Sequence, residues 1–225
     1  MRRSSLVILV GTLVLVCGVA RAAGAAAASA ADAGTVSAVW VDHDLAFTYM
    51  GFTSHYSCSG IEGKVSYVMK QLGARPGYKV TSYGCINMNG PEIMPRVRVR
   101  AALPQEATPE VLAQLETDRS KRELVARAGG KPVAAIDEVT AKFPATWRNV
   151  TFEGTPLSDV QDGDCELMEQ LIRNVLKPMG VREIEGSNLN CVPHQVPINA
   201  VNVKLQVLSA PQGDAGVKSA LAEPR

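Results

Sequence analysis

The pattern of apolar and polar positions describes the same succession of elements twice along this chain. After Trp40 and again after Trp147, apolar side chains alternate with polar ones. After Cys58 and Cys165 the apolar positions follow helical spacing, and two further extended runs come after each helix. Strict alternation is typical of a strand with one buried face, and a 3.6-residue period is typical of an amphipathic helix. The pattern therefore predicts strand, long loop, helix, strand and strand, in two copies.

The two predicted helices carry matching apolar stripes. The stripes consist of Ile61, Val65, Val68, Met69 and Leu72 in the first copy and of Met168, Ile172, Val175, Leu176 and Met179 in the second. Ser59 and Glu62 have the spacing of a capping box, and Gly73 is typical of a helix end. The second helix is expected to begin after Asp164 and to end at Pro178.

Alignment of the two copies indicates an internal duplication. With Cys58 placed on Cys165, the other identical pairs are Glu62/Glu169, Val68/Val175, Lys70/Lys177, Gly73/Gly180 and Arg75/Arg182. We therefore predict an α+β fold made of two β-α-β-β modules, residues 38–104 and 145–211, with antiparallel strands covered by helices. Whether the modules share one sheet or form two small domains is open at this point.

The cysteines predict one disulfide in each module. Geometry favours the pairs Cys58–Cys85 and Cys165–Cys191. A 14-residue helix rises about 21 Å, and the extended run that follows it returns about 23 Å, so the second cysteine comes back beside the first. An even number of cysteines outside the leader is typical of an exported protein.

The N-terminal residues predict export. Arg2 and Arg3 precede an apolar run, residues 6–19, which is too short to span a bilayer and is followed by small residues typical of a cleavage site. We expect residues 1–22 to be a signal peptide, residues 23–37 an Ala-rich flexible linker and residues 212–225 a flexible tail. The mature protein would be periplasmic or secreted, with no stable membrane span.

Charge excludes one class of partner. Removal of the leader leaves 20 basic residues (23 minus 3) and 22 acidic ones, a net charge of −2. Proteins that bind nucleic acids usually carry a basic balance, so we expect no nucleic-acid partner.

The connector, residues 105–144, is predicted to be a charged helical segment. Thr108 and Pro109 are typical of a helix start, and Gly129 of a helix end. The charged run at residues 116–123 indicates a solvated face. The apolar residues Ile136, Val139 and Phe143 suggest a second short helix.

Folding does not require the three arginines Arg96, Arg98 and Arg100. They alternate with valines on one strand, so their side chains share a face at a spacing of about 6.7 Å. Guanidinium groups bind carboxylates and phosphates with two hydrogen bonds each. This row is our predicted binding site for an anionic partner. The alternative is an edge strand protected from aggregation by its charges.

Catalytic and metal chemistry receive weaker support from the sequence. Asp42, His43 and His55 could form a small periplasmic active site, but no serine or cysteine lies at a recognisable spacing from them. His55 and His194 each lie three residues from a predicted disulfide cysteine, and oxidised cysteines cannot bind a metal. We therefore predict no metal site and no cofactor.

The favoured interpretation is an exported, non-catalytic scaffold or binding protein of a bacterial-type envelope, whose ligand the sequence does not identify. It would present the arginines and the loops at residues 50–57 and 157–164 to an anionic envelope polymer or an envelope protein. The element order from Trp40 to Leu115, with Gly51-Phe52-Thr53-Ser54, is similar to that of the SPOR family of peptidoglycan-binding domains. This resemblance implies a cell-wall ligand, although the cysteine pairs and the second copy depart from that family's pattern.

Overall fold

One antiparallel sheet joins the two halves of the chain in the computed structural model, which describes residues 34–85, 90–129, 141–156 and 158–210. The fold is mixed α+β. The strands are β1 (Val36–Thr48), β2 (Lys79–Tyr83), β3 (Arg96–Glu106), β4 (Phe143–Glu153), β5 (Arg182–Glu183), β6 (Asn188–Leu189) and β7 (Val201–Ser209). The predicted signal peptide and tail, and most of the linker, lie outside the described residues.

The strand order answers the question whether the modules share a sheet. It is β2-β3-β1-β4-β7-β5, with β6 also paired to β7. Strands β1 and β4 pair through residues 36–38 and 143–145, at the centre of the order. In the first half of the chain, β3 lies between β1 and β2. In the second half, β7 lies between β4 and β5.

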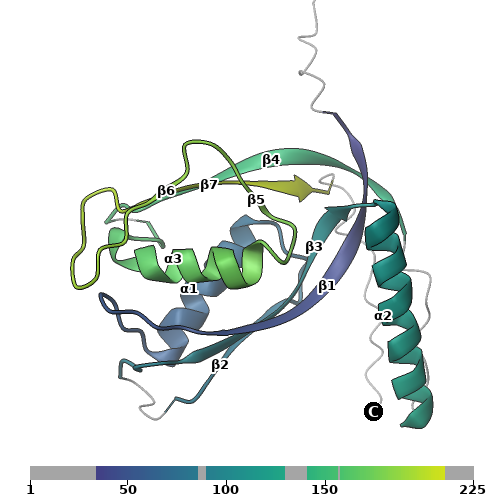
Figure 1. Ribbon diagram of the computed structural model, residues 1–225, viewed down its shortest axis with the longest axis horizontal. Coiled ribbons are helices and arrows are strands. Elements are labelled where there is room, and N and C mark those ends of the chain that lie inside the picture. Colours follow the sequence, from purple (N-terminus) through teal and green to yellow (C-terminus); the bar gives the residue numbers. More distant parts are fainter. Residues whose placement is uncertain (1–33, 86–89, 130–140, 157, 211–225) are drawn as a thin grey trace, which may run out of the picture. The chain divides into compact units, whose positions relative to one another are not determined.

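Two helices fill the space that the curved sheet encloses. Figure 1 shows α1 (Cys58–Gln71) and α3 (Cys165–Leu171) between the β4–β7 arm and the β1–β3–β2 arm. A three-residue 3₁₀ turn, η1 (Asp162–Asp164), precedes α3, and a π-helical turn, η2 (Ile172–Leu176), follows it. A single apolar core includes residues of both arms and both helices, and all ten residues of the predicted stripes belong to it.

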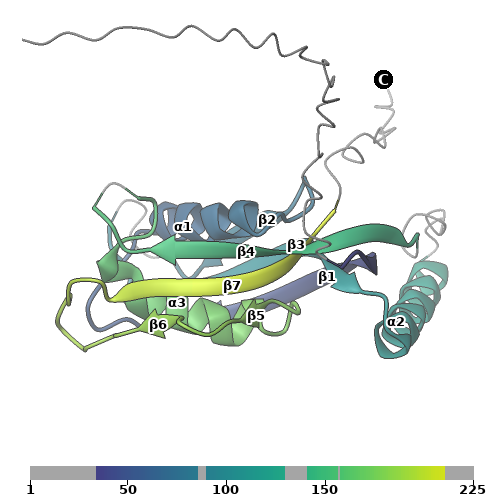
Figure 2. The same ribbon diagram turned by 90° about the horizontal axis from the view of Figure 1, so that it is seen from above.

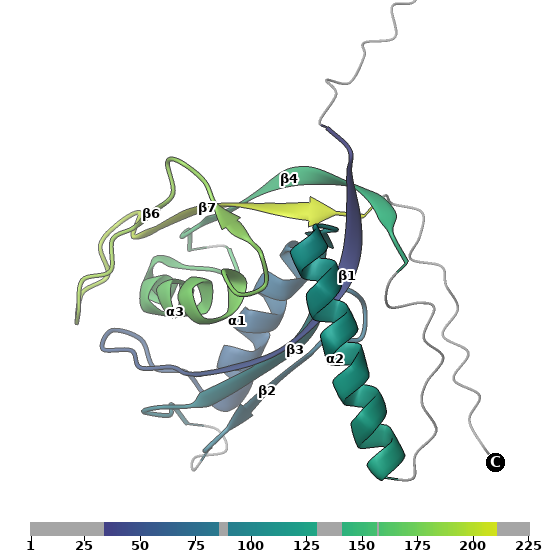
Figure 3. The same ribbon diagram turned by 45° about the vertical axis from the view of Figure 1, so that its right-hand side comes forward.

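Helix α2 (Pro109–Ala128) lies apart from this core. Figures 2 and 3 show it at the end of the sheet opposite the loops that follow β1 and β6. As predicted, Thr108 caps it, with Oγ1 accepting a hydrogen bond from Val111 N at 3.3 Å. The helical interpretation of Phe143 was wrong, because this residue begins β4; Ile136 and Val139 lie outside the described residues.

The predicted cap of α1 was also wrong. Ser57, not Ser59, caps the helix, and its Oγ accepts a hydrogen bond from Gly60 N at 3.1 Å. Glu62 instead accepts hydrogen bonds at 2.6 Å from both the backbone N and the Oγ of Ser82, which joins α1 to β2. Gly73 ends the helix as expected, with a φ of 79° that glycine adopts without steric cost.

Both predicted disulfides are present. Cys58 is bonded to Cys85 and Cys165 to Cys191, across sequence separations of 27 and 26 residues. Such bonds are typical of proteins in an oxidising compartment. Within the described ranges, no helix has both the length and the hydropathy that crossing a bilayer requires.

Candidate functional site

The predicted arginine row lies on the open face of the β2-β3-β1 arm. Val97 and Val99 are buried in the core, so the alternating Arg96, Arg98 and Arg100 face the other way. The residues opposite them across the sheet are Tyr83, Thr81 and Lys79 on β2 and Thr48, Ala46 and Asp44 on β1. Eight of these nine side chains are polar or charged, Ala46 being the exception, and all nine are exposed or half-buried, so this face is in contact with water.

The alternative explanation of the row, an edge strand protected by charge, is wrong. Strand β3 is hydrogen-bonded to β2 on one side and to β1 on the other along the whole stretch that carries the arginines. Its backbone therefore offers no unpaired edge to another chain, and the cations are not needed to block one.

A single carboxylate lies among the cations of this face. Arg98 donates from Nε and Nη2 to the two carboxylate oxygens of Asp44, and the Nε of Arg100 lies 3.3 Å from Asp44 Oδ2. Hydrogen bonding from Arg98 is the main reason why the pKa of Asp44 is lowered from its usual value. Lys79, Arg96, Arg98 and Arg100 against Asp44 give the face a net charge of 4 − 1 = +3. We call these five residues the cationic face.

The corresponding strand of the other arm lacks such a face. At the matching positions β7 carries Asn202, Lys204 and Gln206, so only one cation is present. The charge row is therefore a property of one half of the sheet. It is not a requirement of the shared strand arrangement.

The structure does not bring the proposed catalytic residues together. His43 lies in the middle of β1, and its Nε2 is 3.0 Å from Gln105 Nε2. Because an amide nitrogen can only donate, His43 Nε2 is the acceptor and the ring is neutral. Five strand residues, about 17 Å, separate His43 from the end of β1, and the exposed His55 lies in the loop beyond. Asp42 and His43 do line a cleft of about 470 Å³ beside α2, where Asp42 pairs with Arg122 at 3.6 Å.

We expect His43 to make the stability of the protein depend on pH. Burial lowers its pKa from 6.5, so the unfolded state binds a proton more readily than the folded state. The free energy of unfolding should therefore not depend on the protonation of His43 above about pH 6.5, and it should decrease as the pH falls below that value. Urea unfolding from pH 7.5 to 5 measures this, with His43→Gln as the comparison. The decrease should be smaller in His43→Gln, and equal slopes in the two proteins would contradict the assignment.

The disulfides exclude the metal site that His55 and His194 suggested, and His194 has a ring contact instead. The four cysteines within the described residues are oxidised, so none of them offers a thiolate to complete a metal site with these histidines. The His194 ring meets the Phe52 ring edge-on, with centroids 5.9 Å apart. The described residues of the two loops named from the sequence, 50–57 and 158–164, contact each other through the hydrogen bond from Ser54 Oγ to Gly163 O, so neither is an isolated projection.

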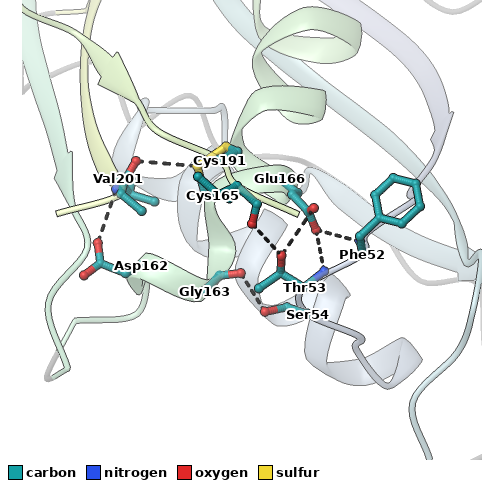
Figure 4. The surroundings of a disulfide bond; sticks show 11 residues. Phe52, Thr53, Ser54, Asp162, Gly163, Cys165, Glu166, Cys191 and Val201 are labelled. Carbon is teal, nitrogen blue, oxygen red and sulfur yellow. Dashed lines mark hydrogen bonds between the residues drawn. A yellow bond between two sulfur atoms is a disulfide. The ribbon is translucent and has the colours of Figure 1, made fainter. Parts of the chain in front are cut away.

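Sequence reasoning missed a buried polar cluster that fixes the loop after β1 (Figure 4). Glu166 Oε2 accepts hydrogen bonds from the backbone N of Phe52 at 2.8 Å and of Thr53 at 3.0 Å. The Gln170 side chain bonds both backbone groups of Met50, and Ser54 Oγ donates to Gly163 O at 2.6 Å. The only signal in the sequence was the presence of Glu166 and Gln170 outside the apolar stripe, where they suggest a solvated helix face.

We compared the chain with known protein families, characterised proteins and solved structures, and none of them matches it.

Proposed function

We propose that this is an exported, non-catalytic binding protein that holds an anionic polymer of a bacterial-type envelope on its cationic face. The observation that carries the proposal is the net charge of +3 on one open sheet surface, where the matching strand of the other arm has a single cation. Charge of this kind on a strand that has no exposed edge favours a role in binding over protection from aggregation.

The geometry suits a repeating anion. Successive arginines on one face of a strand lie about 6.7 Å apart, and a polymer with a carboxylate or phosphate in each unit could contact several of them. Peptidoglycan, whose peptides carry carboxylates, is one polymer of this class.

Export rests on two features. The predicted signal peptide directs the chain out of the cytoplasm, and two disulfides fit an oxidising destination. Each bond ties the start of a helix to a later part of the chain, after β2 in the first half and after β6 in the second, so the scaffold would be resistant to local opening.

Duplication of one module is our proposal for the origin of the scaffold. The two arms pair their strands in the same pattern. Arg75 lies over the ring of Trp40 at 5.9 Å, and the matching Arg182 lies over Trp147 at 4.0 Å. Gly73 and Gly180 both adopt a positive φ. These parallels fall on residues that the sequence alignment pairs, and they support a common ancestor for the arms.

The test is co-sedimentation of the purified protein with intact peptidoglycan sacculi and, separately, retention on immobilised polyphosphate. We expect Arg96→Gln/Arg100→Gln to weaken binding about tenfold or more, because two of the cations are lost. Arg127→Gln/Arg173→Gln is the matched control: it removes the same charge from two exposed arginines outside this face. Equal losses in both variants, or no binding of the unmodified protein to either polymer, would overturn the proposal.

Asp44→Asn should strengthen polymer binding severalfold while it slightly destabilises the fold. The substitution raises the charge of the cationic face to +4 and frees the guanidinium group of Arg98. The lost ion pair is exposed, so it contributes little to the stability of the fold. Polymer titration and urea unfolding of the same sample measure the two effects. A purely structural role for these residues predicts that binding does not improve.

A further inference from the structure

An apolar surface lies at the end of the molecule opposite α2. It is formed by three segments, residues 49–57, 90–95 and 192–199. Six large apolar side chains on them are between 56% and 87% exposed: Met50, Phe52, Ile93, Met94, Val196 and Ile198. We call these six residues the apolar tip. Monomeric proteins rarely leave such a group in water without a binding role.

The first segment adjoins each of the other two. Tyr49 N donates to Pro95 O at 2.9 Å, which places the first segment beside the second. Thr53 Oγ1 donates to Val192 O at 3.3 Å, and the rings of Phe52 and His194 are in contact, which places the first beside the third. The apolar tip is therefore one surface built from distant parts of the sequence.

The backbone under the apolar tip is held in place. Buried Glu166 and Gln170 bond the chain from Met50 to Thr53. Asp162 accepts hydrogen bonds from the backbone N of Asn199 and of Val201, which fixes the end of the third segment. Because these bonds fix the backbone, the apolar side chains are presented to solvent by the fold itself.

Charge decides what kind of partner the apolar tip fits. The three segments contain a single acidic residue, Glu92, and it is only 5% exposed. The exposed Arg96 follows the second segment directly, and Arg98 and Arg100 continue the row along β3. Projecting apolar side chains, no exposed acid and flanking cations are the features of proteins that insert shallowly into an anionic bilayer. A protein-binding surface usually surrounds its apolar centre with a polar rim.

We propose that the apolar tip inserts into the interface of an anionic lipid bilayer, with Arg96 at the level of the headgroups. Phe52, Ile93, Met94 and Ile198 would enter the boundary between headgroups and acyl chains. This inference does not rest on the proposed polymer binding, because the inserting residues lie outside the cationic face. It adds a second ligand of different chemistry, which would place the protein at a membrane surface.

The experiment uses the purified disulfide-bonded protein and vesicles of phosphatidylglycerol and phosphatidylcholine. We expect sedimentation with vesicles rich in phosphatidylglycerol and weak sedimentation with pure phosphatidylcholine. Phe52→Ser/Ile198→Ser should lower the partition coefficient about tenfold or more, since two large apolar groups no longer enter the bilayer. The control Leu124→Ser/Val125→Ser changes side chains of α2 that are 65% and 73% exposed, and it should leave partitioning unchanged.

A second readout tests insertion directly. Phe52→Trp keeps a large apolar group at the tip and adds a fluorophore, which should be quenched by brominated acyl chains, while the unmodified protein with Trp40 and Trp147 should not be. No sedimentation with anionic vesicles, no quenching, or equal losses in the tip and α2 variants would each overturn the inference. Binding of Phe52→Ser/Ile198→Ser to sacculi should persist, which separates a failure here from a failure of the proposed function.

Discussion

Replacing Asp164 with alanine is expected to lower the free energy of unfolding by about 3 kcal/mol, because it leaves buried donors without an acceptor. The Asp164 carboxylate is nearly inaccessible to solvent and accepts three hydrogen bonds. They come from Tyr56 Oη at 2.6 Å, Lys64 Nζ at 2.6 Å and Gln161 N at 2.7 Å. Tyr56 and Lys64 belong to the first arm and Asp164 to the second, so this group joins the two halves.

The three donors contribute unequally to this cost. The Lys64 side chain is about one quarter exposed and can turn its ammonium group towards water when Asp164 is absent. The Tyr56 hydroxyl is buried, and it has no such alternative. Burial is the main reason why the pKa of Tyr56 is raised, with the Asp164 charge adding to it. We therefore place the expected loss at the lower end of the range for a broken buried ion pair, about 3–5 kcal/mol.

Urea unfolding of Asp164→Ala and of Asp159→Ala measures the effect against a matched control. Asp159 is exposed and carries the same charge five residues earlier, so its replacement should change stability by less than about 0.5 kcal/mol. A double-mutant cycle with Lys64→Ala isolates the ion pair from the Tyr56 contribution. If Asp164→Ala and Asp159→Ala were equally stable, the carboxylate would not be the link between the arms.

Local patterns were enough to predict most elements of this fold, although not the start of β4 at Phe143. Val97 and Val99 repeat with the period of a strand, and Ile61 and Val65 with the period of a helix; each pattern reflects which side of the element is buried. The disulfide partners were predictable for the same reason, since the lengths of a helix and a returning strand are set by backbone geometry. These predictions need only the burial pattern within each element and the backbone geometry of helices and strands.

Contacts between distant segments were beyond the reach of these patterns. Whether β3 is an edge strand depends on the position of β2, and whether Arg98 has a partner depends on the β1–β3 register that brings Asp44 beside it. Glu166 looks like a solvent-facing residue of a helix until the loop after β1 is placed on it. In each case the sequence identified the chemistry of the side chain, and the tertiary fold determined its partner.

Removal of the second disulfide, in Cys165→Ala/Cys191→Ala, is expected to lower the free energy of unfolding by about 3–4 kcal/mol. In the chain-entropy model the bond restricts the unfolded state according to the length of the loop it closes, here a separation of 26 residues. Alanine leaves no new polar group in the site of Cys165, which is buried. Urea unfolding under non-reducing conditions gives the value.

The first disulfide supplies the matched control, because Cys58 and Cys85 are separated by 27 residues. Cys58→Ala/Cys85→Ala should therefore lower the free energy of unfolding by nearly the same amount, because the loop released in the unfolded state has nearly the same length. The two variants should differ in the native state. Cys191 immediately precedes Val192, whose carbonyl accepts the Thr53 hydroxyl, and Cys165 immediately precedes Glu166, which bonds the amides of Phe52 and Thr53.

Hydrogen exchange monitored by mass spectrometry distinguishes these effects. In Cys165→Ala/Cys191→Ala we expect faster amide exchange at residues 50–54 and 190–199, because the third segment of the apolar tip is no longer tied to α3. In Cys58→Ala/Cys85→Ala these regions should exchange as in the unmodified protein. Faster exchange in both variants would mean that the bonds stabilise the fold only globally. Faster exchange in the Cys165 variant alone, with reduced vesicle binding, would assign the second disulfide a role in presenting the apolar tip.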